Sequence, residues 1–377
     1  MNHTEYFLKA QNVSNVSLAA FTHYNVTVDR DFQLAHDWFK RVEYMIDRYI
    51  TSWVCVLGVT GNVINLFVLS QKCLRANMGR MEKCAHVGLM ALAVSDLLYC
   101  AVSFPQTLMD RTSIGSPHFD LWVLYRTYSN AFINCFLVSS SWLTVSMAVC
   151  RYLAICHPIF ARQYLGVTTS QTIVLLVFAL SILFNLPRFW MKQVSFIKCV
   201  GEGRYYFTMP GYMERNNTAH VVYMWLYFIL GILLPIIVLL YCNIYLIKAL
   251  KVSNKLRKEH STNSETTHVV TLTLSTIVIL YIVLVGPAEL VIFWKPFVTE
   301  NPLKYGIALR ICNALQMWNF AINFILYCII NVQYRLALKN MICPLRTSFR
   351  ALRNSLQTEN GNNETRVMLD NTETNTA

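Results

Sequence analysis

Residues 85–108 read AHVGLMALAVSDLLYCAVSFPQTL, and this stretch decides the fold of the whole chain. Nearly every residue in it is apolar or small, and Asp96, near its middle, is its only carboxylate. A helix needs roughly 20 mainly apolar residues to cross the hydrocarbon core of a bilayer, which is about 30 Å thick. The stretch therefore predicts a membrane-spanning helix that carries one buried carboxylate.

Six further stretches of the chain are similarly long and apolar. The chain as a whole is 55% hydrophobic and only 14% charged, with a mean hydropathy of +0.39, so water is not its main solvent. We therefore expect an all-α membrane protein, a seven-transmembrane helix bundle with a short amphipathic helix after the last span. The predicted spans are residues 49–70, 85–108, 122–152, 169–190, 219–250, 269–294 and 305–330.

Basic residues gather beside the spans in three segments, 72–83, 248–258 and 335–353. Because short basic loops are retained in the cytoplasm, these segments predict a multi-pass protein of the plasma membrane with an extracellular N-terminus. The net charge of +12 is then explained by basic residues beside the spans, which attract anionic membrane lipids. We expect no nucleic-acid partner. Five Asn-X-Ser/Thr glycosylation acceptors fall on the opposite side, at Asn2, Asn12, Asn15, Asn25 and Asn216.

The spans divide the chain into four regions. Before the first span, Trp38, Val42, Met45 and Ile46 have the spacing of one helix face, which predicts a local helix there. After the last span, Cys343 is a candidate palmitoylation site, and an ordinary free thiol is an equally good interpretation. The regions are a glycosylated extracellular arm (1–48), the seven-transmembrane domain (49–330), a membrane-surface helix (331–345) and a largely disordered cytoplasmic tail (346–377).

Ionisable groups inside the membrane are expensive to bury and are therefore read as functional. Asp96 must face the bundle interior, where Ser140, Asn319 and Asn323 are its predicted polar neighbours, together with Asn62. The two asparagines of the last span are spaced i, i+4 and so share one helical face. Asp96, Ser140, Asn319 and Asn323 are a candidate site for an allosteric sodium ion, and a water-filled polar network is the equal alternative. We expect no other cofactor.

Several short motifs stand in a fixed order along the spans: Gly61-Asn62, Leu92-Ala93 with Asp96, Arg151-Tyr152, Pro235, Pro287 and residues 323–327. With these motifs the chain resembles a rhodopsin-like (class A) G-protein-coupled receptor from the first span through the surface helix. Segments 142–145, 185–189, 241–244 and 323–328 are similar to invertebrate neuropeptide receptors of the FMRFamide, myoinhibitory and sex-peptide type and to related vertebrate orphan receptors.

The resemblance implies a receptor, not an enzyme, that binds an extracellular ligand in its outer half and a heterotrimeric G protein at its inner half. Arg151, with Tyr152, is then the switch residue, which reaches toward Asn243 and Tyr327 when the sixth span swings out. Arrestin and a receptor kinase are further expected partners of the inner face.

The chain also departs from the family pattern. Cys150 stands where an acidic residue usually precedes the family's arginine, so we expect weaker restraint of the resting state. Arg126 stands in place of the family's half-cystine, which leaves two options for Cys199: a disulfide with Cys312 or a free thiol. Val285 and Phe324 replace a tryptophan and a proline in the sixth and seventh spans.

The ligand class is narrowed by two further positions. Ile133 replaces the aspartate that anchors amines in related receptors, and Met317 replaces the retinal-binding lysine of opsins. A short peptide is our first prediction, a small aromatic amino acid or metabolite is the alternative, and an ion-coupled transporter is a third class, disfavoured because no internal repeat is found. The candidate ligand-binding residues are Gln106, Arg126, Asn134, Tyr227, Glu289 and Arg310.

Overall fold

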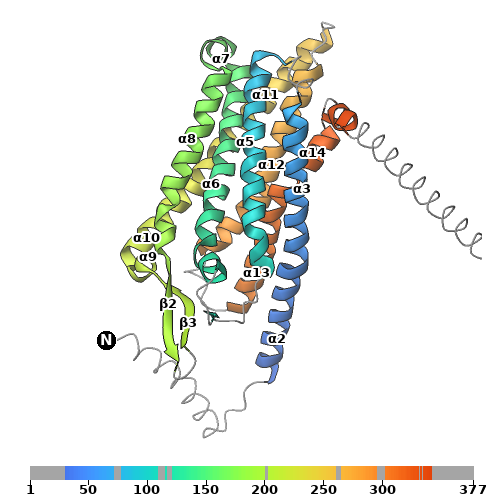
Figure 1. Cartoon of the computed structure of the whole chain (residues 1–377). Helices are drawn as coiled ribbons and strands as arrows, with labels where there is room; N and C mark the ends of the chain where they lie inside the picture. The colour runs from blue at the N-terminus through green and yellow to red at the C-terminus, as the bar shows by residue number, and fades with distance from the viewer. Residues whose placement is uncertain are drawn as a thin grey trace, which may run out of the picture.

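A bundle of long helices, with a small sheet at one end, makes up the protein (Figure 1). The seven-transmembrane all-α bundle predicted from the sequence is confirmed. The computed structural model describes residues 30–71, 78–108, 115–116, 121–199, 203–259, 265–294, 302–330, 332 and 334–341, and statements about the structure refer to these.

Each predicted span lies within one of seven helical stretches. The first three are α2 (Arg30–Met45) with the π-helical η1 (Ile46–Thr51) and α3 (Ser52–Ser70), then α5 (Arg80–Leu108), then α6 (Leu121–Cys156). The next two are α8 (Val167–Asn185) with the 3-10 helix η2 (Leu186–Trp190), then α10 (Asn217–Leu226) with the π-helical η3 (Tyr227–Leu233) and α11 (Leu234–Glu259). The last two are α12 (Glu265–Trp294), then α13 (Pro302–Ala321) with α14 (Asn323–Ile330).

Short helices complete the helical part: α7 (Pro158–Tyr164), α9 (Tyr212–Arg215) and a helix over residues 334–341. Among the described residues, five stretches are long and apolar enough to cross a membrane: Asp37–Ser70, Arg80–Leu108, Leu121–Cys156, Val167–Trp190 and Asn217–Ala249. Of the sixth span, the stretch Ile279–Phe293 is a shorter apolar helix among the described residues. The seventh span is less apolar because Asn313, Gln316, Asn319 and Asn323 lie along it.

The first span extends beyond the predicted limit at residue 49, because α2, η1 and α3 form one uninterrupted helix. The helical spacing predicted over residues 38–46 is thereby confirmed. This outer extension packs on the seventh span, where a Cβ added to Gly306 would come within 2.6 Å of Phe39 Cζ. Arg310 of α13 also pairs with Glu43 and, at 3.5 Å, with Asp47. Packing and charge therefore continue the helix past the membrane.

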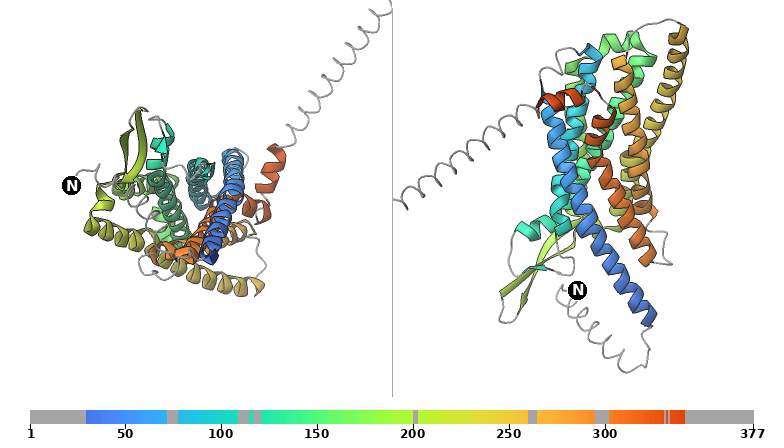
Figure 2. Two further views of the ribbon diagram at one scale, coloured as in Figure 1. Left: turned by 90° about the horizontal axis from the view of Figure 1, so that it is seen from below. Right: turned by 90° about the vertical axis from the view of Figure 1, so that its right-hand side faces the viewer.

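The sequence reasoning missed a three-stranded antiparallel sheet of strand order β1-β3-β2. Its strands are β1 (Gly115–Ser116), β2 (Lys192–Cys199) and β3 (Gly203–Pro210). The register pairs Lys192 with Pro210 next to the bundle and Cys199 with Gly203 at the far tip. Figure 2 shows this hairpin and α2 projecting from the same end of the bundle, while the helix after α14 lies across the opposite end.

Close helix packing depends on small residues, as is usual where helices meet in a membrane. A Cβ added to Gly88 of α5 would lie 2.6 Å from Met147 Cγ of α6. Gly61 of α3 is similarly close to Phe324, whose Cβ would lie 2.9 Å away. Phe324, which replaces the family's proline, thus fills the contact between the first and seventh spans.

Candidate functional site

A cavity of about 760 Å³ opens among the helices at the end of the bundle that carries the sheet, where Lys192 of β2 is part of its lining. Its volume is within the range of about 300–1,000 Å³ that is typical of small-ligand sites. All six candidate ligand-binding residues line it: Gln106, Arg126, Asn134, Tyr227, Glu289 and Arg310. The structure therefore brings the predicted set together, and their contact with a ligand stays a prediction.

Hydrogen bonds between helices hold most of these side chains in place. Gln106 Nε2 of α5 donates to Ser129 Oγ of α6 at 2.8 Å. The hydroxyl of Tyr227, on the fifth span, donates to Asn134 Oδ1 on the third at 2.9 Å. Such bonds fix the cavity walls before any ligand arrives, which lowers the entropy lost on binding.

Charged groups of both signs line the cavity. Glu289 of α12 is 3% exposed, and its Oε1 accepts a hydrogen bond from Gln316 Nε2 at 2.6 Å. At the mouth, Lys192 Nζ lies 2.8 Å from Glu214 Oε2, and Arg310 pairs with the acidic residues of the first span. Aromatic rings add an apolar surface, since Phe228 and Phe293, which also line the cavity, stack with their centroids 3.8 Å apart.

One lining residue that the sequence analysis did not select is Arg188 of η2. Its guanidinium Cζ lies 4.1 Å from the centroid of the Tyr227 ring. In the sequence, segment 185–189 contributed only to the family resemblance. The signal that could have identified it is a lone cation directly after a proline at the outer end of an apolar span.

The candidate sodium site is partly assembled in the bundle core. Asp96 is fully buried, and each carboxylate oxygen accepts one hydrogen bond, from Ser140 Oγ at 2.7 Å and from Asn323 Nδ2 at 2.6 Å. Asn319 is buried one turn earlier on the seventh span. Asn62 is engaged elsewhere, because its Nδ2 donates to Phe320 O at 2.8 Å. A carboxylate and a hydroxyl in contact are oxygen donors that suit a hard cation.

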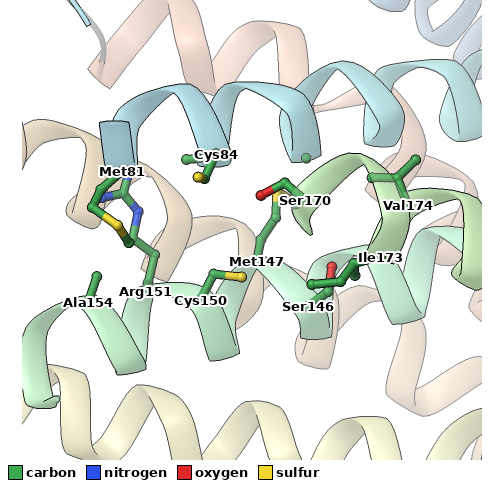
Figure 3. Close-up of a pocket in the computed structure, with 12 residues that line it drawn as sticks. Met81, Cys84, Ser146, Met147, Cys150, Arg151, Ala154, Ser170, Ile173 and Val174 are labelled. Carbon is green, nitrogen blue, oxygen red and sulfur yellow. The ribbon is translucent and has the colours of Figure 1, made fainter. Parts of the chain in front are cut away.

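The predicted switch residue Arg151 is 5% exposed and points from α6 toward the start of α5 (Figure 3). It lines a small pocket with Met81, Cys84 and Cys150. Its Nε and Nη2 atoms are buried, and the described part of the chain offers them no hydrogen-bond partner. With Cys150 in the family's acidic position, the guanidinium is thus enclosed by thioether and thiol groups.

The other three switch residues make separate contacts. Tyr152 packs its ring against Tyr241 and Tyr245, with centroids 5.8 and 6.1 Å away. Asn243 Nδ2 donates to the carbonyl of its own helix at Leu239, at 2.7 Å. The Tyr327 ring lies 5.5 Å from that of Tyr334 in the helix after α14. The role of these residues as a switch stays a prediction.

The Cys199–Cys312 disulfide considered in the sequence analysis is wrong, because Cys312 is a free thiol in the structure. The physical reason is the path of the hairpin, which puts Cys199 at its far tip while Cys312 lies within α13. Asn216 is exposed, and its Oδ1 caps α10 by accepting from Ala219 N at 3.2 Å. The remaining acceptors, Asn2, Asn12, Asn15 and Asn25, and also Cys343, lie outside the described residues.

Comparisons with known proteins agree with this architecture. The family model described as 7 transmembrane receptor (rhodopsin family) matches residues 64–327. The Drosophila melanogaster FMRFamide receptor is 24% identical over 308 residues, which cover 78% of this chain and 53% of that receptor, so the chain spans about half its length. The Caenorhabditis elegans sex peptide receptor-related protein 2 is 25% identical, with coverage of 81% of this chain and 73% of the relative.

The somatostatin receptor type 2 of Mus musculus is also 25% identical, over 80% of this chain and 78% of that receptor. At identities of 24–25%, the ligand named for a relative is not assigned to this chain. The family match covers well over half of the chain, and its limits run from the first span to the end of the seventh. The chain belongs to the rhodopsin family of seven-transmembrane receptors.

Proposed function

We propose that the protein is a plasma-membrane receptor with an extracellular N-terminus that binds a short peptide and activates a heterotrimeric G protein. The observation that carries the proposal is the cavity of about 760 Å³ at the end opposite Arg151, lined by groups of both charges and by aromatic rings. A receptor needs an outer ligand site and an inner site that responds to it. The cavity and the Arg151 pocket provide the two sites.

A peptide matches the chemistry of the cavity better than a single small group does. Glu289 can bind a cationic side chain, because Gln316 occupies one of its carboxylate oxygens and leaves the other for a ligand. The stacked rings of Phe228 and Phe293 offer a surface for a ligand aromatic ring. Relatives named as receptors for FMRFamide, somatostatin and galanin support a peptide as the ligand class.

On the inner side, we infer that Arg151, Tyr152, Asn243 and Tyr327 rearrange to receive the G protein. The buried guanidinium of Arg151 has donors that no described protein group uses, so a partner's backbone carbonyls can accept them once the pocket opens. Arrestin and a receptor kinase are proposed to use the same face, and inner-leaflet lipids to contact the basic helix after α14.

We also propose that a sodium ion binds at Asp96 as an allosteric ligand. The ion would take the oxygens of Asp96 and Ser140, with Asn319 and Asn323 as further donors. It would supply a positive charge that stabilises the buried carboxylate and so favours the helix arrangement that holds these residues together.

The test is expression of the full chain with a promiscuous G protein and a screen of neuropeptides beside free amino acids, with intracellular calcium as the readout. We expect a response to a peptide with a cationic side chain, and a concentration for half-maximal response that rises about 10- to 100-fold in Glu289→Gln, as for loss of a charge-assisted hydrogen bond.

The matched control is Glu214→Gln, the same substitution at an ion pair of the cavity mouth with side chains 42% and 35% exposed. Because exposed ion pairs contribute little, its potency should change by less than about threefold. Silence to every peptide with a response to free tryptophan or phenylalanine would replace the peptide by an amino acid. Ligand uptake without nucleotide exchange on the G protein would replace the receptor by a transporter.

A further inference from the structure

Arg188 is held against two tyrosine rings at the outer end of the fourth span. Its Cζ lies 4.1 Å from the centroid of Tyr227 and 5.6 Å from that of Tyr223. Both distances are within the roughly 6 Å range of cation–π attraction. The hydroxyl of Tyr227 is in turn held by Asn134 Oδ1 at 2.9 Å, so the ring beneath the guanidinium cannot swing freely. The cation is therefore oriented before a ligand enters.

One donor of this guanidinium, the Nε–H group, has no hydrogen-bond partner among the described residues. Stacking on a ring engages the face of the planar group, whereas its N–H groups point outward in the plane. The Nε atom of Arg188 is buried, and the described part of the chain gives it no acceptor. A buried donor without a partner is unfavourable. A ligand that supplies an acceptor would remove this penalty.

Two other basic residues that line the cavity, Lys192 and Arg310, are already paired with carboxylates. Lys192 pairs with Glu214 at 2.8 Å, and Arg310 pairs with Glu43 and Asp47. No salt bridge of Arg188 occurs among the described residues. Glu289 interacts with Arg188 electrostatically but is hydrogen-bonded by Gln316 instead.

We propose that Arg188 anchors a carboxylate of the ligand. A carboxylate matches two parallel N–H donors of a guanidinium and brings a negative charge into direct contact with it, which a neutral amide would not do. With Glu289 elsewhere in the same cavity, the ligand is dipolar: its carboxylate lies at Arg188 and its cationic group at Glu289. The inference rests on the proposed function, whose ligand site it specifies, and it makes Arg188 a specificity-determining residue.

The test uses the purified full-length receptor in detergent and does not depend on G-protein coupling. Thermal unfolding is followed with a thiol-reactive dye, since Cys55, Cys100 and Cys242 are buried free thiols. The probes are N-acetyl-L-phenylalanine, which imitates a peptide C-terminus, its amide, and free L-phenylalanine. We expect the first to raise the melting temperature and the amide to have no effect.

The variant Arg188→Gln should weaken binding of the carboxylate probe by about 10- to 100-fold, as for loss of a charge-assisted hydrogen bond. Arg188→Lys should retain part of the affinity because it keeps the charge and loses the planar pair of donors. The matched control Arg41→Gln, at an exposed arginine outside the cavity lining, should bind as the unchanged receptor does. Melting temperatures without probe show whether each variant is folded.

Equal shifts with the acid and the amide, an unchanged shift in Arg188→Gln, or no shift with any probe would overturn the proposal. An Arg188-dependent shift that is larger with free L-phenylalanine supports the carboxylate anchor and identifies an amino acid as its source. Failure of the receptor function would be seen separately, as absence of G-protein activation by every compound in the calcium screen.

Discussion

Replacing Tyr334 by phenylalanine tests how firmly the helix after the seventh span is attached to the bundle. The Tyr334 hydroxyl donates to Asn65 Oδ1 of α3 at 2.7 Å, and the two residues are 1% and 0% exposed. Phenylalanine keeps the ring and leaves the Asn65 oxygen buried without its donor. An unsatisfied buried acceptor costs about 1–3 kcal/mol, whereas polar contacts between membrane helices average about 0.6 kcal/mol with a maximum near 1.7.

We therefore expect Tyr334→Phe to lower the free energy of unfolding by about 1 kcal/mol, which corresponds to a melting temperature lower by about 2 °C for a chain of this size. Unfolding of the purified receptor in detergent, followed by the exposure of its buried thiols, measures the change. Tyr164→Phe, which removes a hydroxyl from an exposed tyrosine of α7, is the matched control and should leave the melting temperature unchanged.

A double-mutant cycle with Asn65→Val separates this hydrogen bond from general repacking. Because valine removes the acceptor as well, the double variant should be more stable than the sum of the two single effects predicts, by about 0.5–1.5 kcal/mol. If the two effects simply add, the hydroxyl and the amide do not interact, and the attachment of this helix must come from ring packing alone.

Three further substitutions test other parts of the structure. Cys150→Asp gives Arg151 an acidic neighbour and should lower nucleotide exchange without ligand; unchanged or higher basal exchange would contradict the restraint argument. Asp96→Asn should abolish the rise in melting temperature when choline chloride is replaced by sodium chloride, and a persisting rise would exclude this sodium site. Gly88→Ala forces a Cβ against Met147 and should destabilise the receptor by about 1–3 kcal/mol, as measured by denaturant unfolding. A variant as stable as the unchanged receptor would contradict this packing argument.

Hydropathy and one buried charge are sufficient to predict the helical fold of this protein and part of its polar core. A membrane allows few backbone structures, so seven apolar stretches are sufficient to predict seven helices. Asp96 then fixes which faces point inward, and its predicted neighbours Ser140 and Asn323 do contact it. The family register extends the same logic to the outer cavity, where six predicted residues meet.

Hydropathy does not predict the structural features that the sequence analysis missed. The path of the hairpin after Trp190 depends on strand pairing, and this path separates Cys199 from Cys312. The outward extension of the first span depends on contacts with the seventh span, such as Phe39 on Gly306. Arg188 ends an apolar span, and its significance becomes visible only when two tyrosines from the fifth span are seen beneath it.

The uninterrupted first helix is tied to the last part of the chain near both surfaces of the membrane. Its outer part pairs Glu43 with Arg310 at the cavity mouth, and its inner part accepts a hydrogen bond at Asn65 from Tyr334. The 22 residue steps from Glu43 to Asn65 span about 33 Å at about 1.5 Å per step, close to the full thickness of the hydrocarbon core. A ligand that displaces Arg310 from Glu43 is therefore expected to weaken the outer attachment of the same rigid helix whose inner end holds Tyr334.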